Sequence, residues 1–190
     1  FEQMSSAPLL TASEIDRQMG ATPKTTAARW MLIDPQPVPL SGDNETPLEP
    51  GSPGYHELRV RELVRQMLVC KMHGADGIFI ANPFTGPDGV LNVDGTPGEL
   101  LLPWRTTAML LAGKTYLGSL QLPHESTNHV FIGDDDQVVM VIWNDRDCNE
   151  ELYLGDKIKQ TDVWGKLRAV ERNEQGKSTI AVGKMPSFIV

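Results

Sequence analysis

The chain has 190 residues, which is room for one ordinary domain or two small ones. Its formal net charge of −8 argues against nucleic-acid binding, because the neutralisation of phosphates requires a basic surface. A hydrophobic fraction of 40% argues against disorder over most of the length, and 17 Gly and 14 Pro predict many turns in place of a helical bundle.

Neither a targeting segment nor a membrane span is predicted. Residues 1–20 carry four charged side chains and no apolar core, so they do not resemble a signal peptide. The most apolar stretch, 106–113, is too short to cross a bilayer and lies between Arg105 and Lys114. The sequence therefore indicates a soluble chain and leaves its compartment unassigned. Because the chain starts at Phe1, we expect either a removed N-terminus or a section of a longer polypeptide.

The first half of the chain alternates predicted helices and strands. Thr11 and Glu14 have the spacing of a capping box, which predicts a short helix as far as about Met19. The apolar run 27–33 is short and stops before Asp34-Pro35, as a buried strand would.

A proline-rich loop is predicted for residues 35–54, and the clearest helix follows it at 55–73. Gly74 should end this helix, and 75–81 is a second apolar run that closes at Asn82-Pro83. A strand, a helix and a strand in this order form a βαβ unit, which predicts a parallel pair of strands.

The second half changes in character. A glycine-rich loop at 85–98 leads into a helix that should end near Leu111. After it, eight short strand-like runs are separated by turn residues: 116–122, 129–132, 138–143, 152–154, 157–163, 166–170, 179–182 and 187–190. We therefore expect an α/β segment over 1–114, with a partial barrel-like βαβ unit, followed by an all-β antiparallel sandwich over 115–190.

Several of these segments look like parts of one known architecture. Residues 74–80 with Asn82-Pro83 look like the last strand of a barrel, and 102–113 look like the helix that closes it. Residues 138–143 look like a central sandwich strand, and 161–165 with 180–190 are similar to the end of such a sandwich. From about residue 27 onwards, the chain thus resembles the C-terminal part of a glycoside-hydrolase-like protein, in which a (β/α)8 barrel precedes a β-sandwich.

This resemblance implies a carbohydrate-related section of a larger protein. A complete barrel needs about 250 residues, so the chain would hold roughly its last quarter and lack most catalytic strands. It would then not be catalytic by itself, and its partners would be carbohydrate and the remainder of its parent chain. Two alternatives stay open: a non-catalytic β-sandwich accessory or interaction module, and a free-standing small protein whose likeness to a barrel is accidental.

The resemblance also directs attention to particular residues. Glycosidases use two carboxylates, and barrel enzymes place catalytic groups at the carboxyl ends of strands. Asp34 ends the first predicted strand and is the candidate catalytic carboxylate, with a turn role before Pro35 as its alternative. Glu2 is a second candidate if Phe1 ends an earlier strand.

Candidate substrate-binding residues accompany these carboxylates. Trp30 and Phe84 could stack on sugar rings, and Asn82 ends the second strand of the βαβ unit. Core packing is the alternative for Trp30, since it stands beside an apolar run.

No metal or cofactor is predicted. Residues 134–136 are three aspartates that invite a calcium interpretation, but a solvated hairpin turn is favoured. Around Asp94 and Gly95 the register of an EF-hand fails, because Leu101 stands where the bidentate Glu must be. The four histidines lack zinc-site spacing, and glycine-rich phosphate loops and a G-x-S-x-G elbow are absent.

The two cysteines complete the inventory of reactive groups. Cys70 falls in the predicted helix and Cys148 in a predicted polar turn, far apart in sequence. We therefore expect two free thiols and no disulfide.

Overall fold

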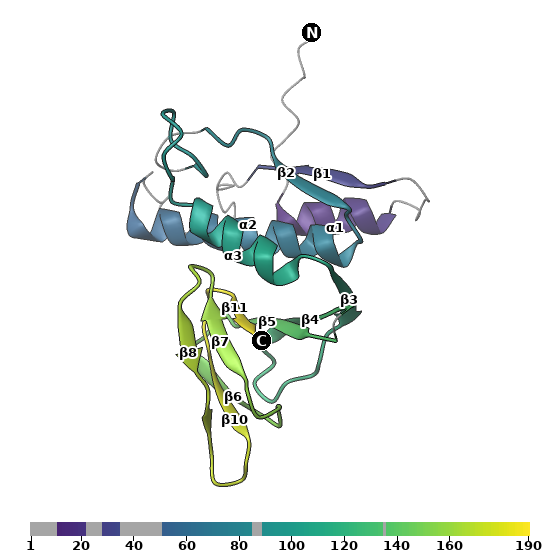
Figure 1. Cartoon of the computed structure of the whole chain (residues 1–190), viewed down its shortest axis with the longest axis vertical. Helices are drawn as coiled ribbons and strands as arrows, with labels where there is room; N and C mark the ends of the chain where they lie inside the picture. The colour runs from purple at the N-terminus through teal and green to yellow at the C-terminus, as the bar shows by residue number, and fades with distance from the viewer. Residues whose placement is uncertain (1–10, 22–27, 35–50, 85–88, 135) are drawn as a thin grey trace, which may run out of the picture. The chain divides into compact units, whose positions relative to one another are not determined.

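The computed structural model describes residues 11–21, 28–34, 51–84, 89–134 and 136–190. The chain divides into two compact units, Phe1–Gly98 and Glu99–Val190 (Figure 1). The helix that precedes the strands therefore belongs to the second unit. The domain boundary that the sequence suggests between residues 114 and 115 stays a prediction.

The first unit begins with helix α1 (Ala12–Ala21), whose N-terminus is closed by the predicted capping box. The Glu14 carboxylate accepts hydrogen bonds from the Thr11 N–H at 2.7 Å and the Thr11 hydroxyl at 2.8 Å. In return, the Glu14 N–H donates to the Thr11 hydroxyl at 3.2 Å. The bonds from Thr11, the backbone one first, hold the pKa of Glu14 below its ordinary value. The capping box is confirmed.

Helix α2 (Pro53–Met72) begins two residues earlier than the sequence pattern suggested, because Ser52 is its N-cap and Pro53 its first residue. The Ser52 hydroxyl accepts a hydrogen bond from the Tyr55 N–H at 3.3 Å. At the other end, Gly74 has φ +73°, and its N–H donates to the Lys71 carbonyl at 3.0 Å. The predicted glycine stop is confirmed.

Polar contacts hold α1 against α2. The Ala12 N–H donates to the Glu62 carboxylate at 2.6 Å, at one end of α1. Near the middle of α1, the Asp16 carboxylate lies 2.7 Å from Nε2 of His73. Ile15 and Met19 of α1 are buried, so the two helices also share apolar contacts.

Strands β1 (Trp30–Ile33) and β2 (Gly77–Ile80) pair in parallel, in a register that runs from Trp30 beside Gly77 to Ile33 beside Ile80. The parallel pair predicted for the βαβ unit is confirmed. Helix α2 contacts β1 and buries an apolar stripe that includes Leu63, Val64 and Leu68. Most of the predicted proline-rich loop, residues 35–50, lies outside the described residues.

The described residues of the second unit form helix α3 (Leu101–Leu111) and nine strands. The strands are β3 (Lys114–Gly118), β4 (Thr127–Gly133), β5 (Val138–Trp143), β6 (Cys148–Leu152), β7 (Lys159–Asp162), β8 (Leu167–Ala169), β9 (Glu171–Arg172), β10 (Ser178–Val182) and β11 (Ser187–Ile189). They form a six-stranded sheet in the order β3-β4-β5-β11-β7-β8 and a three-stranded sheet in the order β6-β10-β9. Every pairing described in these two sheets is antiparallel.

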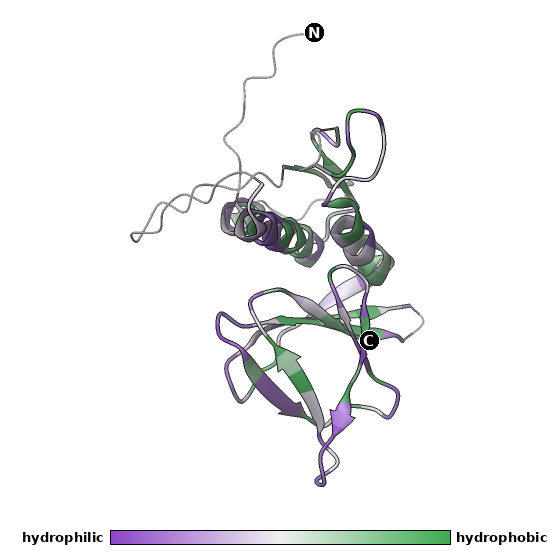
Figure 2. Cartoon of the chain, turned by 90° about the vertical axis from the view of Figure 1, so that its left-hand side faces the viewer, coloured by the Kyte–Doolittle hydropathy of each residue, from purple (hydrophilic) through white to green (hydrophobic). Residues whose placement is uncertain are grey.

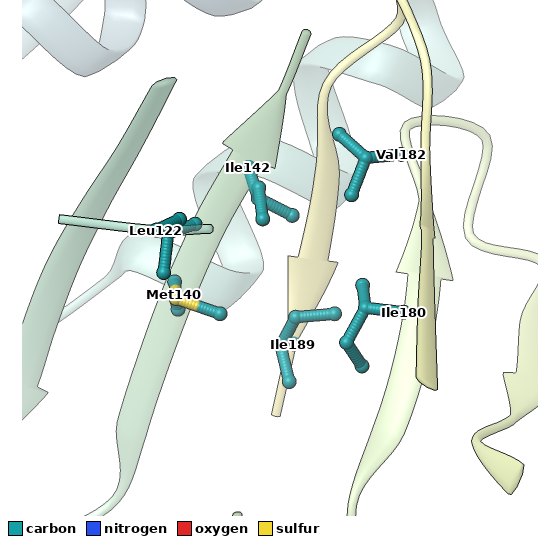
Figure 3. Packing of buried hydrophobic residues seen from close by; sticks show 6 residues of the cluster. All are labelled: Leu122, Met140, Ile142, Ile180, Val182 and Ile189. Carbon is teal, nitrogen blue, oxygen red and sulfur yellow. The ribbon is translucent and has the colours of Figure 1, made fainter. Parts of the chain in front are cut away.

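The two antiparallel sheets share an apolar core. Met140 and Ile142 of β5 and Ile189 of β11 come from the larger sheet, and Ile180 and Val182 of β10 come from the smaller one (Figure 3). Figure 2 shows hydrophobic strands within this unit and hydrophilic residues in its hairpin turns. An α/β lead-in followed by antiparallel sheets is thus confirmed, and the β-sandwich stays a prediction that the shared core supports.

Asp134 and Asp136 stand between β4 and β5, which pair antiparallel, and Asp135 lies outside the described residues. The Gly133 N–H donates to the Gln137 carbonyl at 3.0 Å, and the Asp136 N–H donates to the Gly133 carbonyl at 3.1 Å. Asp136 has φ +58°, a conformation that aspartate tolerates in tight turns. The favoured interpretation, a hairpin turn, is confirmed.

Across the part of the chain that the structure describes, no helix is both long enough and apolar enough to cross a membrane.

The shared core yields a stability prediction. Ile180 is fully buried between the sheets, so Ile180→Ala should lower the free energy of unfolding by about 2–5 kcal/mol. Leu167→Ala is the matched control, because Leu167 is 59% exposed and should lose less than about 1 kcal/mol. Urea unfolding followed by circular dichroism measures both. Equal losses in the two variants would contradict the core that the structure defines.

Candidate functional site

The carboxyl ends of β1 and β2 bring two of the sequence candidates to the same edge. Asp34 directly follows Ile33, the last residue of β1, and Asn82 lies two residues beyond the end of β2. The Ala81 N–H donates to the Ile33 carbonyl at 3.0 Å, so the ladder of the parallel pair continues to this edge. Asp34 is half-buried and Asn82 is exposed.

Local hydrogen bonds fix the backbone at this edge. The side-chain amide of Gln66, on α2, donates to the Asp34 carbonyl at 3.3 Å. The Asn82 side-chain oxygen accepts from the Phe84 N–H at 3.3 Å, which makes a tight turn directly after the strand. This turn leaves the Phe84 ring 52% exposed, within two residues of Asn82. Asp34, Asn82 and Phe84 thus form the candidate sugar-binding edge.

Trp30 lies at the opposite end of the same strands. It begins β1 and pairs with Gly77, which begins β2, so about 13 Å of strand separates it from Asp34. Its ring is 72% exposed and packs on the Phe79 ring with 5.6 Å between centroids. Core packing, the alternative considered for Trp30, is therefore wrong within this unit. The structure does not bring Trp30 to the candidate sugar-binding edge.

Trp30 belongs instead to an apolar face of the parallel pair. Leu32 is 57% exposed and Phe79 is 49% exposed, and the register places these two residues side by side. Gly77 makes room for them, since a Cβ there would lie 3.0 Å from the Phe79 ring. Trp30, Leu32 and Phe79 are called the open sheet face below. The remaining candidate, Glu2, lies outside the described residues.

The candidate sugar-binding edge offers one carboxylate, one amide and one aromatic ring. Together these groups can accept and donate hydrogen bonds to sugar hydroxyls and cover the apolar side of a sugar ring. Glycoside hydrolysis needs a second carboxylate as well. Among the described residues, no group of three or more His, Cys, Asp or Glu side chains is arranged to hold a metal ion.

A buried carboxylate that sequence reasoning missed lies in the second unit. Glu150 of β6 is fully buried and accepts hydrogen bonds from the Ser126 hydroxyl at 2.6 Å and the His124 N–H at 3.1 Å. The Asn144 amide donates to the same hydroxyl at 3.0 Å and to the His124 carbonyl at 3.1 Å. Glu150 therefore anchors the segment before β4, and its hydrogen bonds explain why it tolerates burial.

The loop that contains Asp94 is held by hydrogen bonds among its own residues. The Asp94 carboxylate accepts from the Thr96 hydroxyl at 2.7 Å and the Thr96 N–H at 3.0 Å, and these bonds hold the pKa of Asp94 below its ordinary value. The Asn92 amide donates to the same hydroxyl at 2.9 Å, and Gly95 has φ +83°. The Asn, Asp and Gly residues that resemble part of a calcium loop thus build a tight turn.

Both cysteines are free, as predicted. Cys148 begins strand β6, so its predicted place in a polar turn is wrong, and its sulfur lies 3.5 Å from the Ser126 hydroxyl oxygen. Cys70 is fully buried in α2, and this burial raises the pKa of its thiol to about 12.

The different burial of Cys70 and Cys148 predicts that a thiol reagent will modify one of them selectively. At neutral pH Cys70 stays protonated and inaccessible, so a thiol reagent such as Ellman's reagent should label about one cysteine per native chain, namely Cys148. Native Cys148→Ser should therefore release no chromophore, and urea should expose one thiol in it. Rapid labelling of Cys70 in the native chain would contradict the packing of α2.

Comparison with solved structures finds a match to a family 39 glycoside hydrolase from the gut symbiont Bacteroides cellulosilyticus WH2. The match has a TM-score of 0.56 and 18% sequence identity, and it covers 71% of this chain and 30% of that chain. At this identity the match shows a shared fold alone, over less than a third of the relative's length. No protein-family model and no curated protein matches the sequence.

Proposed function

We propose that this chain is the C-terminal section of a glycoside-hydrolase-like protein, that it is carbohydrate-related, and that it does not catalyse hydrolysis by itself. The observation that carries the proposal is the parallel pair β1–β2, which gathers Asp34, Asn82 and Phe84 at its carboxyl edge. This edge is where (β/α)8 barrels place their functional residues.

The open sheet face supports the idea of a section. Parallel sheets are ordinarily covered on both faces, whereas here α2 contacts β1 and Trp30, Leu32 and Phe79 stay exposed. The sheet is two-stranded in the described residues, so each strand also has an edge with no neighbouring strand. Further parallel strands of the parent barrel would cover the face and pair with the edges. The match to 30% of a longer glycoside hydrolase agrees with this view.

The proposed roles follow from the chemistry of each group. The Asp34 carboxylate would accept hydrogen bonds from sugar hydroxyls or serve as one of the two catalytic carboxylates. The Asn82 amide, on the same edge, would bind a hydroxyl, and the exposed Phe84 ring would stack on a sugar face. A second carboxylate would come from another strand of the parent barrel, outside this chain. Asp34 is the one carboxylate that the described residues place at the edge, so we expect no turnover from this chain.

A non-catalytic accessory or interaction module is the second candidate function. Exposed aromatic rings in the second unit favour this function, since Tyr153 is 75% exposed and Trp164 is 44% exposed. This function would not require the parallel pair to be completed by further strands.

The proposal predicts the outcome of an activity assay. Purified chain should release no nitrophenol from a panel of p-nitrophenyl glycosides above the rate of the buffer, because a lone carboxylate cannot act as both acid and nucleophile. Asp34→Asn should leave this background unchanged, as should the control Asp156→Asn, whose carboxylate pairs with Arg172 at 2.7 Å. Turnover that Asp34→Asn abolishes and Asp156→Asn preserves would show that the chain is an enzyme in its own right.

A further inference from the structure

The three-stranded sheet β6-β10-β9 has one face that turns away from the core. Ile180 and Val182 of β10 point into the core with the larger sheet (Figure 3). Because side chains alternate along a strand, the residues between and beside them lie on the opposite side. The outer face, as it is called below, consists of Asn149, Glu151, Tyr153, Glu171, Lys177 and Thr179.

The register sets these residues in rows across the sheet. Thr179 of β10 lies beside Glu151 of β6 on one side and beside Glu171 of β9 on the other. Two residues beyond Thr179 on β10, Ala181 lies beside Asn149, and its methyl side chain projects only a short distance from the sheet. The rows span about 10 Å across the strands and about 13 Å along them. The outer face is therefore a shallow platform, wide enough for an extended ligand.

One aromatic ring stands at the end of this platform. Tyr153 is 75% exposed, and the Lys177 ammonium lies 5.6 Å from its ring centroid. The same ammonium lies 4.0 Å from the Glu151 carboxylate, so Lys177 connects the ring to the polar rows. A cation over one face of the ring restrains its orientation while most of the residue stays in solvent.

We propose that the outer face binds a neutral glycan chain. The exposed Tyr153 ring offers an apolar surface for one sugar ring, and carboxylate, amide, hydroxyl and ammonium groups beside it can bind sugar hydroxyls. Strands hold Asn149, Glu151 and Thr179 at fixed positions, and Tyr153 and Lys177 directly adjoin the ends of β6 and β10, which lowers the entropic cost of binding. This inference rests on the carbohydrate relation in the proposed function, and it assigns a second site outside the parallel pair.

The charges and the scarcity of apolar surface define the class of ligand. The outer face carries two carboxylates, Glu151 and Glu171, against one ammonium, Lys177, so it would repel a polyanionic glycan. A protein partner would need an apolar patch at the centre of the interface, whereas this platform has one aromatic ring amid polar groups. Neutral sugar hydroxyls match such a surface, because ionised side chains form strong hydrogen bonds with them.

Affinity electrophoresis tests the inference on the intact chain. The probes are gels that contain hydroxyethylcellulose, galactomannan or arabinoxylan, with polygalacturonate as the charged comparison. At least one neutral polysaccharide should retard the chain, and Tyr153→Ala should weaken that binding roughly tenfold, which is about 1.4 kcal/mol. Tyr153→Phe should bind nearly as well because it keeps the ring. Leu167→Ala is the matched control, because Leu167 is an exposed apolar side chain on β8, outside the outer face, and its loss should leave binding unchanged.

Several outcomes would overturn the outer-face site. They are no retardation by any neutral polysaccharide, stronger retardation by polygalacturonate, or equal retardation of the wild type and Tyr153→Ala. Binding that Phe84→Ala removes and Tyr153→Ala preserves would also overturn it, while it would support the candidate sugar-binding edge. Thermal unfolding of Tyr153→Ala, expected to match the wild type, separates lost binding from lost structure. The glycoside assay reports on the proposed function independently of all these outcomes.

Discussion

The parallel pairing of β1 with β2 is the constraint on which the first unit depends. Two parallel strands cannot be joined by a tight turn, so the chain must cross over between them, and α2 makes that crossing. Its buried stripe covers one side of the unit and leaves the side with Trp30, Leu32 and Phe79 exposed. The same pairing brings Asp34 and Asn82 to one edge. The proposed sugar contacts and the proposed further strands therefore have one origin.

In the second unit, the residues of that unit themselves form the apolar core and supply the hydrogen bonds to the buried carboxylate. Its two antiparallel sheets bury Ile142, Ile180 and Ile189 between them, and hydrogen bonds satisfy the buried carboxylate of Glu150. A rigid sheet can then present polar groups on its outer surface at little entropic cost. We propose that the two units bind carbohydrate in different ways. The first offers the candidate sugar-binding edge, on a sheet that further strands would extend, and the second offers the outer face.

The sequence predicted most elements because each had a local signal. Local signals include the capping box at Thr11, the glycine at position 74 and the continuous apolar run of β5, and the structure bears them out. Exposure was harder to predict, since Trp30 stands beside an apolar run yet lies on the open sheet face. An apolar run indicates a strand without showing which of its faces will be covered.

Features that depend on contacts between residues far apart in sequence could not be predicted from local sequence patterns. Glu150 is buried because Ser126 and His124, more than twenty residues away, donate hydrogen bonds to it. Cys148 follows turn residues, which predict that it belongs to the turn, but pairing with Val182 makes it the start of β6. The outer face likewise arises from the register of three strands, and no motif predicts that Thr179 will lie between two glutamates.

Hydrogen–deuterium exchange of the intact chain tests the central claim most directly, namely that β1 and β2 are part of an incomplete sheet. Among the described residues, each of these strands has one neighbouring strand, whereas β5 lies between β4 and β11 and is largely buried. Peptides that cover 30–33 and 77–80 should therefore exchange much faster than a peptide that covers 138–143. Equal and strong protection of all three would contradict the account, because it would mean that the chain itself already covers the parallel pair.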